Sequence, residues 1–279
     1  PLPTPEEIED SADVIKKRRS RCISRVGPRY VVKFGSQVDK IEGENMYWVC
    51  QNTPEVPVPK VFAIYQRDVT PRTKITYIIM EDVAAHPLDA LWDSLSMNQK
   101  RDVVIQIRQA FTHLRVANNM GDFGSIDTAK PRDDIFWMDE PSIQDQAMFK
   151  SEAEFTQALI DKYMTYCGNS EPHKAQYYRR VLPTVLQGNG QPLFTHNDLR
   201  RKNILIREDG NIVIKGWATA GWYPSYWEYA KAMHVCDFSD DWHEYLGKIL
   251  NQEYPSHIPK GRPRQPSKRY TVFNTIKSW

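Results

Sequence analysis

One β-hairpin signal in the second half of the chain limits the possible folds most strongly. Residues 203–217, "NILIREDGNIVIKGW", contain two apolar runs joined by Asp209 and Gly210, a pair typical of two-residue hairpin turns. The sequence around this hairpin has apolar residues at helical spacing. It predicts helices over 96–118, 151–167, 174–187, 225–236 and 240–251. This half is therefore expected to be a helical domain that holds one β element.

Two of these helices carry a start signal. Ser96 and Gln99 have the spacing of a capping box, and Ser151 and Glu154 repeat it. The first of the two helices should bury one apolar face, formed by Val104, Ile107, Phe111 and Leu114.

The first part of the chain has a different pattern. Residues 22–34 read as two short strands around a Gly-Pro turn, and 37–53 have helical spacing. Residues 54–65 return to extended chain, and 72–82 predict a strand covered on both faces. The predicted fold class is therefore α+β, with a two-lobed plan. Its β-rich N-lobe covers 1–82 and its mostly helical C-lobe 83–279, and the cleft between them is the expected ligand site.

Composition excludes several classes of protein. The chain has 41% apolar and 26% charged residues, which is ordinary for a soluble globular protein. No run approaches the roughly 18 apolar residues that cross a bilayer, so we expect no membrane partner. The first ten residues lack a signal-peptide pattern. Four widely spaced cysteines, at positions 22, 50, 167 and 236, fit reduced thiols in the cytoplasm.

Charge gives no general attraction to nucleic acid, because the formal net charge is only +2. Two basic clusters, 16–21 and 260–269, lack interleaved aromatic residues and are expected to be solvated surface. The sequence carries no signal for the oligomeric state.

The strongest chemical motif is "HNDLRRKN", residues 196–203, an H-x-D-x(4)-N pattern just before the hairpin. In phosphoryl transfer, such an Asp accepts or orients the proton of the attacking hydroxyl, and such an Asn binds a metal that bridges the phosphates. These roles would fall to Asp198 and Asn203. The alternative is a structural loop in which the Asp caps a turn and the Asn satisfies backbone amides. His196 is expected to pack the loop.

Three consecutive cations, Arg200, Arg201 and Lys202, lie inside this motif. They favour an anionic ligand, either a phosphate or a substrate carboxylate. Exposure of at least two of them to solvent is an equally good interpretation.

Two further segments need an interpretation. The aromatic run "WYPSYWEY" (222–229) predicts core packing more readily than a substrate pocket, with Glu228 as a buried ion-pair partner. "GDFG" (121–124) contains the Asp-Phe-Gly triplet that binds metal in protein kinases. Because it precedes the catalytic motif, it is interpreted as a helix end and a loop.

These motifs resemble the aminoglycoside-phosphotransferase-like family of protein-kinase-like fold, particularly its fungal branch. The segments that carry the resemblance are "RYVVKFG" (29–35), "ENMYWVCQNTPEVPVPKV" (44–61), "ITYIIMED" (75–82), "FTHNDLRRKNILI" (194–206) and "AGWYPSYWEYAKA" (220–232). Together they extend from about residue 22 to residue 236. The resemblance implies a phosphotransferase fold with an ATP cleft between the lobes, and ATP and Mg²⁺ as cofactors.

The resemblance also implies nucleotide-binding residues. Lys33 is similar to the strand lysine that contacts the phosphates, and its helix partner is Glu42 or Glu44. Glu42 shares an apolar helix face with Met46 and Val49, whereas Glu44 lies about 200° round the helix, so Glu42 is the better partner. A capping box between Asp39 and Glu42 is the alternative.

The hinge between the lobes resembles residues Met80, Glu81 and Asp82, whose backbone would meet an adenine.

The segment "IKGWAT" departs from the family. Gly216 stands where the family has its metal-binding Asp, and Ala218 stands where a Glu usually follows. Mg²⁺ prefers carboxylate oxygens, so Asn203 is left as the main metal ligand. Lys215 should point away from position 216, because side chains alternate along a strand; the alternative is a turn that rotates it inward. No glycine-rich loop precedes Lys33, which is a milder departure.

Three functions follow from these observations. The favoured one is a repurposed small-molecule enzyme of secondary metabolism, with Mg-ATP phosphotransfer impaired by the loss at Gly216. The first alternative is a functional ATP-dependent phosphotransferase that acts on a small-molecule hydroxyl. The second is a non-catalytic pseudokinase that binds a ligand or a partner protein.

Overall fold

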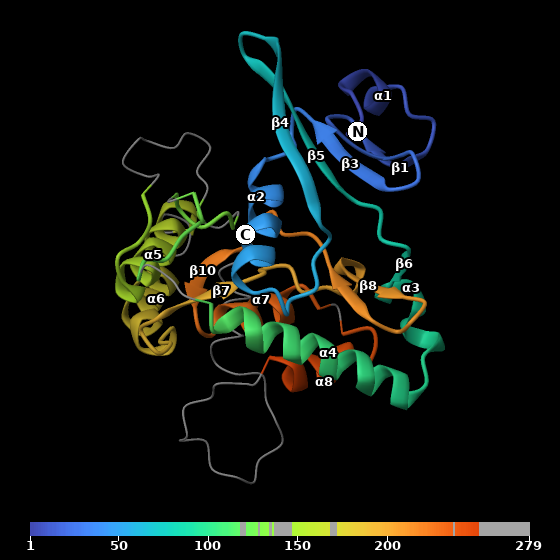
Figure 1. The fold of residues 1–279 in the computed structure, drawn as a ribbon. Coiled ribbons are helices and arrows are strands. Elements are labelled where there is room, and N and C mark those ends of the chain that lie inside the picture. Colours follow the sequence, from blue (N-terminus) through green and yellow to red (C-terminus); the bar gives the residue numbers. More distant parts are fainter. Residues whose placement is uncertain are drawn as a thin grey trace. The chain divides into compact units, whose positions relative to one another are not determined.

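The computed structural model describes residues 1–117, 121–127, 129–133, 136, 147–167, 172–236 and 238–250. The chain forms two compact units (Figure 1). Unit 1 contains Pro1–Gln99 and Arg201–Ala218, and unit 2 contains Lys100–Arg200 and Thr219–Trp279. The expected lobe boundary at 82/83, which was drawn from secondary structure alone, stays a prediction.

An antiparallel five-stranded sheet forms much of unit 1. Its strand order is β1-β2-β3-β5-β4, with bounds β1 Val14–Arg18, β2 Arg21–Val26, β3 Tyr30–Gly35, β4 Val61–Thr70 and β5 Thr73–Glu81. Helix α1 (Pro5–Glu9) precedes it. The two strands around the Gly-Pro turn are confirmed, with Gly27 at φ +63°. Strand β1 was missed because all five of its residues are exposed, so it lacks an apolar face.

Helix α2 (Ile41–Asn52) packs closely on this sheet. A Cβ at Gly43 would lie 2.8 Å from Ile64 Cδ1 and 3.0 Å from Ile78 Cγ2, so only glycine permits this approach. Glu42 and Met46 are buried on the same helix. The glycine therefore determines how near Glu42 comes to the strands.

The predicted hairpin forms the second sheet of unit 1. Strands β8 (Ile204–Arg207) and β9 (Ile212–Ile214) are antiparallel, with Gly210 in the turn at φ +81°. The sequence predicted that this hairpin would be an isolated β element. That prediction is wrong, because strand β6 (Ala85–Pro87) pairs with β8. Short helices complete this region: α3 Leu88–Leu91, η1 Trp92–Ser94 and η4 Arg201–Asn203.

Unit 2 is mostly helical, as predicted. Its helices are α4 Met97–Arg115, α5 Glu152–Cys167, α6 Pro172–Val185, α7 Trp227–His234 and α8 Trp242–Ile249, with the first turn of α4 in unit 1. Both halves of the Ser96–Gln99 capping box are present at the start of α4. The predicted apolar face of α4 is buried. The β-rich N-terminal region and helical C-terminal region confirm the α+β class.

Sequence reasoning missed a two-stranded ladder in unit 2. Strand β7 (Pro192–Thr195) pairs with β10 (Gly221–Pro224), and β10 starts the aromatic run. Each strand has only four residues, which is too short for a clear alternating pattern.

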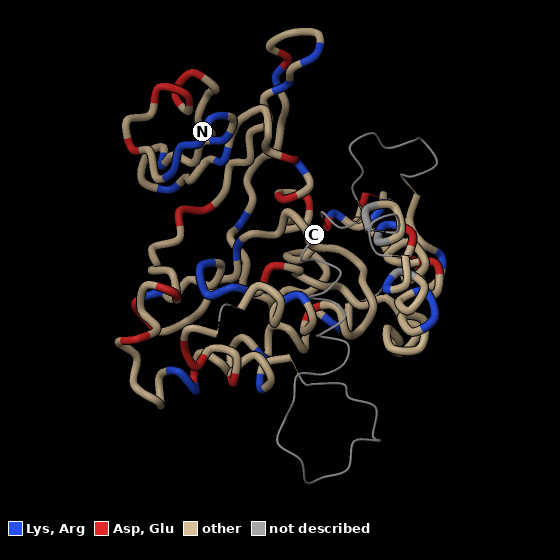
Figure 2. The backbone as a smooth tube through the Cα atoms, turned by 180° about the vertical axis from the view of Figure 1, so that it is seen from behind, with Lys and Arg blue, Asp and Glu red and all other residues tan. Residues whose placement is uncertain are grey.

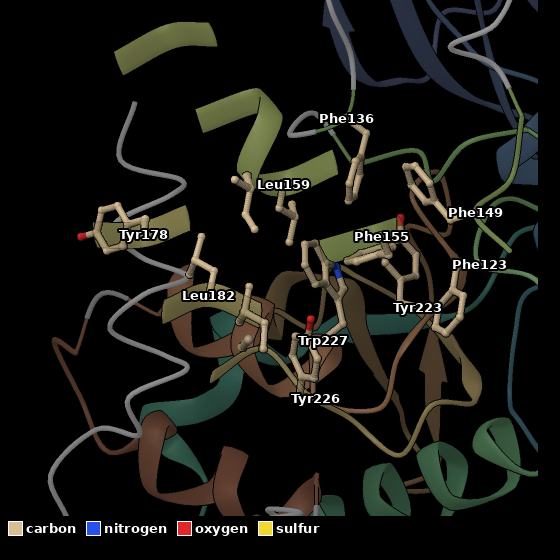
Figure 3. Packing of buried hydrophobic residues seen from close by; sticks show 13 residues of the cluster. Phe123, Phe136, Phe149, Phe155, Leu159, Tyr178, Leu182, Tyr223, Tyr226 and Trp227 are labelled. Carbon is tan, nitrogen blue, oxygen red and sulfur yellow. The ribbon is translucent and has the colours of Figure 1, made fainter. Parts of the chain in front are cut away.

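The aromatic run packs into the core of unit 2 (Figure 3). Phe155 of α5 contacts Trp227 edge-on, with ring centroids 5.0 Å apart. Tyr223 and Trp227 stack at 5.5 Å. Phe123 of the "GDFG" segment belongs to the same cluster and is 1% exposed. The core interpretation of the run is confirmed, and the Asp-Phe-Gly triplet contributes a core side chain.

Several expectations concern the surface and the cysteines. The basic cluster 16–21 lies on the β1–β2 hairpin (Figure 2). Its Lys and Arg residues are exposed. Cluster 260–269 and the Cys167 side chain lie outside the described residues. Cys22, Cys50 and Cys236 are free thiols. Among the helices that the structure describes, none combines the length and hydropathy needed to span a bilayer.

Candidate functional site

The first part of the catalytic motif, residues 196–200, follows β7 in unit 2. His196 is fully buried and meets the Phe111 ring edge-on, with centroids 6.4 Å apart. Its Nδ1 accepts a hydrogen bond from the Asp198 backbone N–H at 3.2 Å. His196 therefore has the packing role that the sequence predicts, and it also orients the backbone of Asp198.

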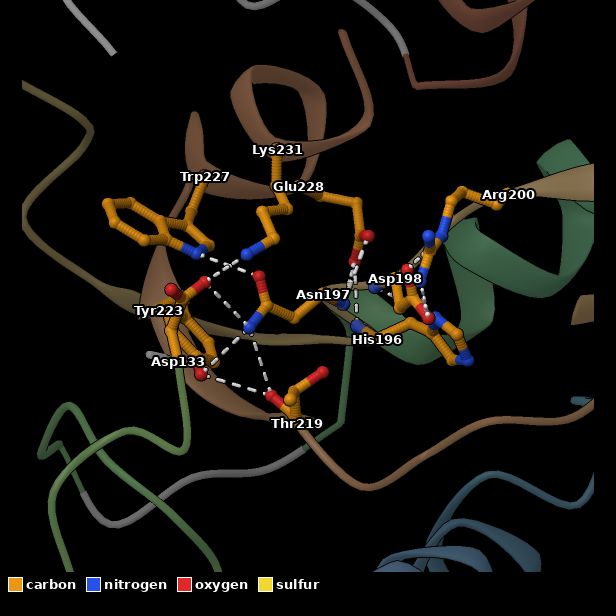
Figure 4. Close-up of polar contacts among 10 residues, drawn as sticks. All are labelled: Asp133, His196, Asn197, Asp198, Arg200, Thr219, Tyr223, Trp227, Glu228 and Lys231. Carbon is orange, nitrogen blue, oxygen red and sulfur yellow. Dashed lines mark hydrogen bonds and ion pairs between the residues drawn. The ribbon is translucent and has the colours of Figure 1, made fainter. Parts of the chain in front are cut away.

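Asn197 holds this segment in a conformation that few residues tolerate. Its φ is +67°, in the left-handed region where Asn is enriched among non-glycine residues. Its Oδ1 accepts from Trp227 Nε1 at 3.0 Å. Its Nδ2 lies within hydrogen-bonding distance of Asp133 Oδ2 at 3.1 Å, Thr219 O at 3.2 Å and Tyr223 Oη at 3.1 Å (Figure 4). Buried contacts therefore determine the backbone that precedes Asp198.

Glu228 fixes the same segment from helix α7. It is 1% exposed and accepts the backbone N–H of His196 at 2.6 Å and that of Asn197 at 3.1 Å. Burial raises the pKa of its carboxyl to about 7, although Arg115 and the two backbone amides favour the ionised form. The sequence predicted a buried ion-pair partner. The burial is confirmed, but the hydrogen-bonding partners of Glu228 are the backbone amides of His196 and Asn197. The sharp turn at Asn197 leaves these two amides without their usual backbone acceptors.

Asp133 completes this network. It is fully buried, and its Oδ2 pairs with Lys231 Nζ at 2.6 Å while it accepts from Asn197. Sequence reasoning missed Asn197, Asp133 and Lys231. The only local signal was the Asn between His196 and Asp198, since Asn is a residue that adopts positive φ. Asp133 lies 64 residues away from Asn197, and no local pattern marks such a contact.

Asp198, the predicted base, forms an ion pair two residues along the chain. Arg200 Nε donates to Asp198 Oδ1 at 2.5 Å, and Nη2 donates to Oδ2 at 2.8 Å (Figure 4). The two side chains are 21% and 40% exposed, Asp198 being the less exposed. This two-pronged geometry is the one that Arg uses for carboxylates and phosphates. One predicted anion-binding cation is therefore engaged by the predicted base.

The second part of the motif lies in unit 1. Asn203, at the end of η4, is 7% exposed. Its backbone carbonyl accepts a hydrogen bond from the Lys215 backbone N–H at 2.9 Å. Gly216 has φ +88°, and a Cβ there would lie 2.9 Å from both Cγ and Oδ1 of Asn203. The Asn203 carboxamide thus packs on the glycine, in the space that a side chain at 216 would enter. The backbone itself now requires glycine.

A divalent metal does not fit these residues. Mg²⁺ is normally held through carboxylates, and neither Gly216 nor Ala218 supplies one. No group of three or more His, Cys, Asp or Glu side chains arranged to hold a metal occurs among the described residues. Burial lowers the pKa of the neighbouring Lys215 amine, which also feels the charge of Glu42. The donor set at position 216 is therefore reduced to the Asn203 carboxamide.

The candidate phosphate-binding lysine forms the ion pair that the sequence favours. Lys33 Nζ pairs with Glu42, and their side chains are 17% and 9% exposed. Glu44 pairs with Lys40 instead, at 2.6 Å. The alternative capping box does not form, since Asp39 Oδ1 accepts the Ile41 amide at 3.1 Å. The role of Lys33 and Glu42 in nucleotide binding stays a prediction.

The predicted hinge, Met80 to Asp82, ends strand β5 and is partly buried. Its acidic side chains are used within unit 1: Glu81 pairs with Arg207 at 2.9 Å, and Asp82 pairs with Arg25 at 2.5 Å. These ion pairs fasten the end of β5 to β8 and β2.

The hinge amides are also occupied. The N–H groups of Glu81 and Asp82 donate to the carbonyls of Lys60 and Arg29, at 2.8 and 3.0 Å. Within the described chain, the next two amides, those of Val83 and Ala84, have no backbone partner. The contact of Met80, Glu81 and Asp82 with an adenine stays a prediction.

The other two cations of the motif differ from Arg200. The Arg201 guanidinium lies over the Trp92 ring, 5.5 Å from its centroid. Lys202 is exposed. The three cations therefore have different surroundings, and a carboxylate holds Arg200 in a two-pronged contact.

Comparison with solved structures identifies the fold. The chain resembles the apo form of a thermostable mutant of aminoglycoside phosphotransferase APH(4)-Ia, with 17% identity, 88% of this chain and 78% of that chain covered, and a TM-score of 0.57. It also resembles a thermostable mutant of APH(4)-Ia in ternary complex with ADP and hygromycin B, with 14% identity, 97% of this chain and 86% of that chain covered, and a TM-score of 0.63. The likeness to the gentamicin–APH(2″)-IIa complex has 14% identity, covers 94% of this chain and 78% of that chain, and has a TM-score of 0.57.

These likenesses confirm the kinase-like fold class. A comparison with curated proteins gives no match. The model of the phosphotransferase enzyme family, however, matches residues 18–259, which is most of the chain and includes both parts of the catalytic motif. The chain therefore belongs to the phosphotransferase enzyme family.

Proposed function

We propose that this chain is a diverged member of its family that binds a small molecule with an anionic group, and that magnesium-dependent phosphoryl transfer from ATP is impaired. The observation that carries this proposal is the packing of Asn203 on Gly216, at φ +88°. The metal-binding carboxylate is absent, and the space for its side chain is filled.

The expected loss is large. Charge on a transferring phosphoryl group is stabilised chiefly by electrostatic contacts, and removal of one such contact costs about 3 kcal/mol, or roughly a hundredfold in rate. A protein ligand that holds the metal ion bridging the phosphates should matter at least as much.

Other parts of the site support small-molecule chemistry. The Lys33–Glu42 pair and the carboxylate of Asp198 are retained, so phosphate binding and acid–base catalysis both have candidate residues. The titles of similar structures name ADP, hygromycin B and gentamicin, which supports a small-molecule ligand. A cytoplasmic, repurposed enzyme of fungal secondary metabolism remains part of this proposal, on the resemblance of residues 220–232.

The second candidate is a functional ATP-dependent phosphotransferase for a small-molecule hydroxyl. The retained ion pair between Lys33 and Glu42 favours it, since this pair must be in place for phosphoryl transfer in kinases.

Calorimetric titration of ATP, once with Mg²⁺ and once with EDTA, separates the candidates. The proposal expects affinities that differ by less than about threefold, and no ATP turnover above the background rate. Tight binding that requires Mg²⁺, together with ATP consumption, would establish the second candidate. Absence of nucleotide binding in both titrations would favour a role without nucleotide, including that of a pseudokinase.

A further inference from the structure

The contact between Arg200 and Asp198 points to a ligand. We propose that Arg200 is the receptor for an oxyanion group of the substrate, and that Asp198 occupies this receptor until the substrate arrives. The substrate's carboxylate or phosphate then takes the guanidinium, and the Asp198 carboxylate becomes available to accept a proton. This inference rests on the proposed function and names the substrate class of the same site.

The geometry leaves part of the guanidinium for a ligand. Arg has five N–H donors, and Asp198 uses one on Nε and one on Nη2. Among the described residues, Nη1 of Arg200 has no acceptor, and the side chain is 40% exposed. An oxyanion can therefore reach the outer edge of the guanidinium before Asp198 leaves its inner edge.

The backbone around this pair is held independently of it. The Asp198 N–H donates to His196 Nδ1, and its carbonyl accepts the Arg200 N–H at 2.8 Å. Glu228 and the Asn197 network fix the preceding residues. Release of the carboxylate therefore requires rotation of side chains only, and the loop does not have to refold.

Competition within the chain makes the receptor selective. Asp198 is tethered two residues from Arg200, so it acts at a high effective concentration. A simple anion should bind only in the millimolar range, whereas a substrate with further contacts can displace the carboxylate. A polycation gains nothing from Arg200 and is repelled by it. The loop thus selects anionic substrates, in contrast to the aminoglycosides named for the similar structures.

The test measures binding of inorganic phosphate and of succinate by calorimetry at fixed ionic strength, without Mg²⁺. Arg200→Met should weaken binding of the preferred anion at least about tenfold, the range expected for loss of a charge-assisted bidentate contact. Arg200→Lys keeps the charge without the fork and should give an intermediate loss. Asp198→Asn removes the internal competitor and should tighten binding at least about threefold. An effect confined to phosphate or to succinate identifies which oxyanion the receptor takes.

Arg180→Met is the matched control, because Arg180 is an exposed arginine of the same unit on α6. It should leave anion affinity unchanged, and thermal unfolding of each variant checks that it is folded. Arg200→Met with wild-type affinity for both anions would overturn the proposal. Weaker binding by Asp198→Asn would also overturn it, since Asp198 would then position Arg200 and not compete for it. Neither result bears on magnesium dependence, so failure of the proposed function is detected separately.

Discussion

The two parts of the catalytic motif differ in what has been retained. The segment before Asp198 is held by a buried network that includes Asn197, Glu228 and Asp133. The segment around Asn203 and Gly216 has backbone contacts as well, but positions 216 and 218 carry no carboxylate. The hydrogen bonds that hold the backbone are thus present in both segments, whereas the second segment offers no carboxylate at positions 216 and 218. Under the proposed function, the reaction differs from that of the family while the backbone around Asp198 stays held.

The largest expected effect tests the buried network that holds the segment before Asp198. Asn197→Ala should lower the free energy of unfolding by about 3–5 kcal/mol, because it removes the buried hydrogen bonds to Trp227 Nε1 and Asp133 Oδ2 and puts alanine at a positive φ. Urea unfolding measures it. The control Asn98→Ala, at an exposed position on α4, should change stability by less than about 0.5 kcal/mol. Equal effects of the two substitutions would contradict the structural role of the network.

The pH dependence of stability tests the contribution of Glu228 to the same buried network. Its pKa is raised from 4.5 to about 7, so between these values the folded state keeps a proton that the unfolded state releases. Stability should therefore fall as pH rises from 4.5 to 7, by up to about 3 kcal/mol. Charges of Arg115 and Asp198 also act on this carboxyl. Chemical unfolding across this range should show the fall in wild type and a flatter profile in Glu228→Gln. Parallel profiles would exclude Glu228 as the source.

Gly216→Asp sharpens the comparison at the other segment. If only a side chain were missing, this change would restore magnesium-dependent ATP binding. The structure instead predicts that Gly216→Asp lowers the free energy of unfolding by about 2 kcal/mol. The new Cβ would lie 2.9 Å from Asn203, and the residue would keep φ +88°. Gly210→Asp in the exposed hairpin turn, where φ is +81° but the space is open, separates backbone strain from the clash. A stable Gly216→Asp protein that binds Mg-ATP would show that the metal site needs one side chain only.

The smallest effect concerns the Lys33–Glu42 pair. Glu42→Gln should lower the free energy of unfolding by about 1–2 kcal/mol, because it leaves the partly buried Lys33 ammonium without its counter-charge. The exposed pair Lys40–Glu44 is the control, and Glu44→Gln should cost less than about 0.5 kcal/mol. Unfolding in urea at two salt concentrations compares them, because an exposed pair is screened more strongly. Similar costs for both would remove the distinction between a site pair and a surface pair.

Much of the fold was predictable because its signals are local. The hairpin at Asp209 and Gly210, the cap at Ser96 and the apolar face of α4 each depend on residues close in sequence. Strands β1, β7 and β10 were not predicted, since the first is exposed on both faces and the other two are short.

The candidate site was predictable in its residues more than in its contacts. Asp198, Asn203 and the pair of Lys33 with Glu42 follow from motif spacing and helical geometry. The partners of Glu228 did not follow, because an acceptor for backbone amides 31 and 32 residues away leaves no pattern in the sequence.

The amino-acid sequence by itself determined that a phosphotransferase-like motif is present and that positions 216 and 218 carry no carboxylate. Only the tertiary structure decided that Asn203 fills the space at Gly216, that Asn197 adopts a left-handed backbone, and that Arg200 holds Asp198. The physical reason is that a sequence states which groups exist, whereas the free energy of buried polar contacts depends on which groups the fold brings within hydrogen-bonding distance.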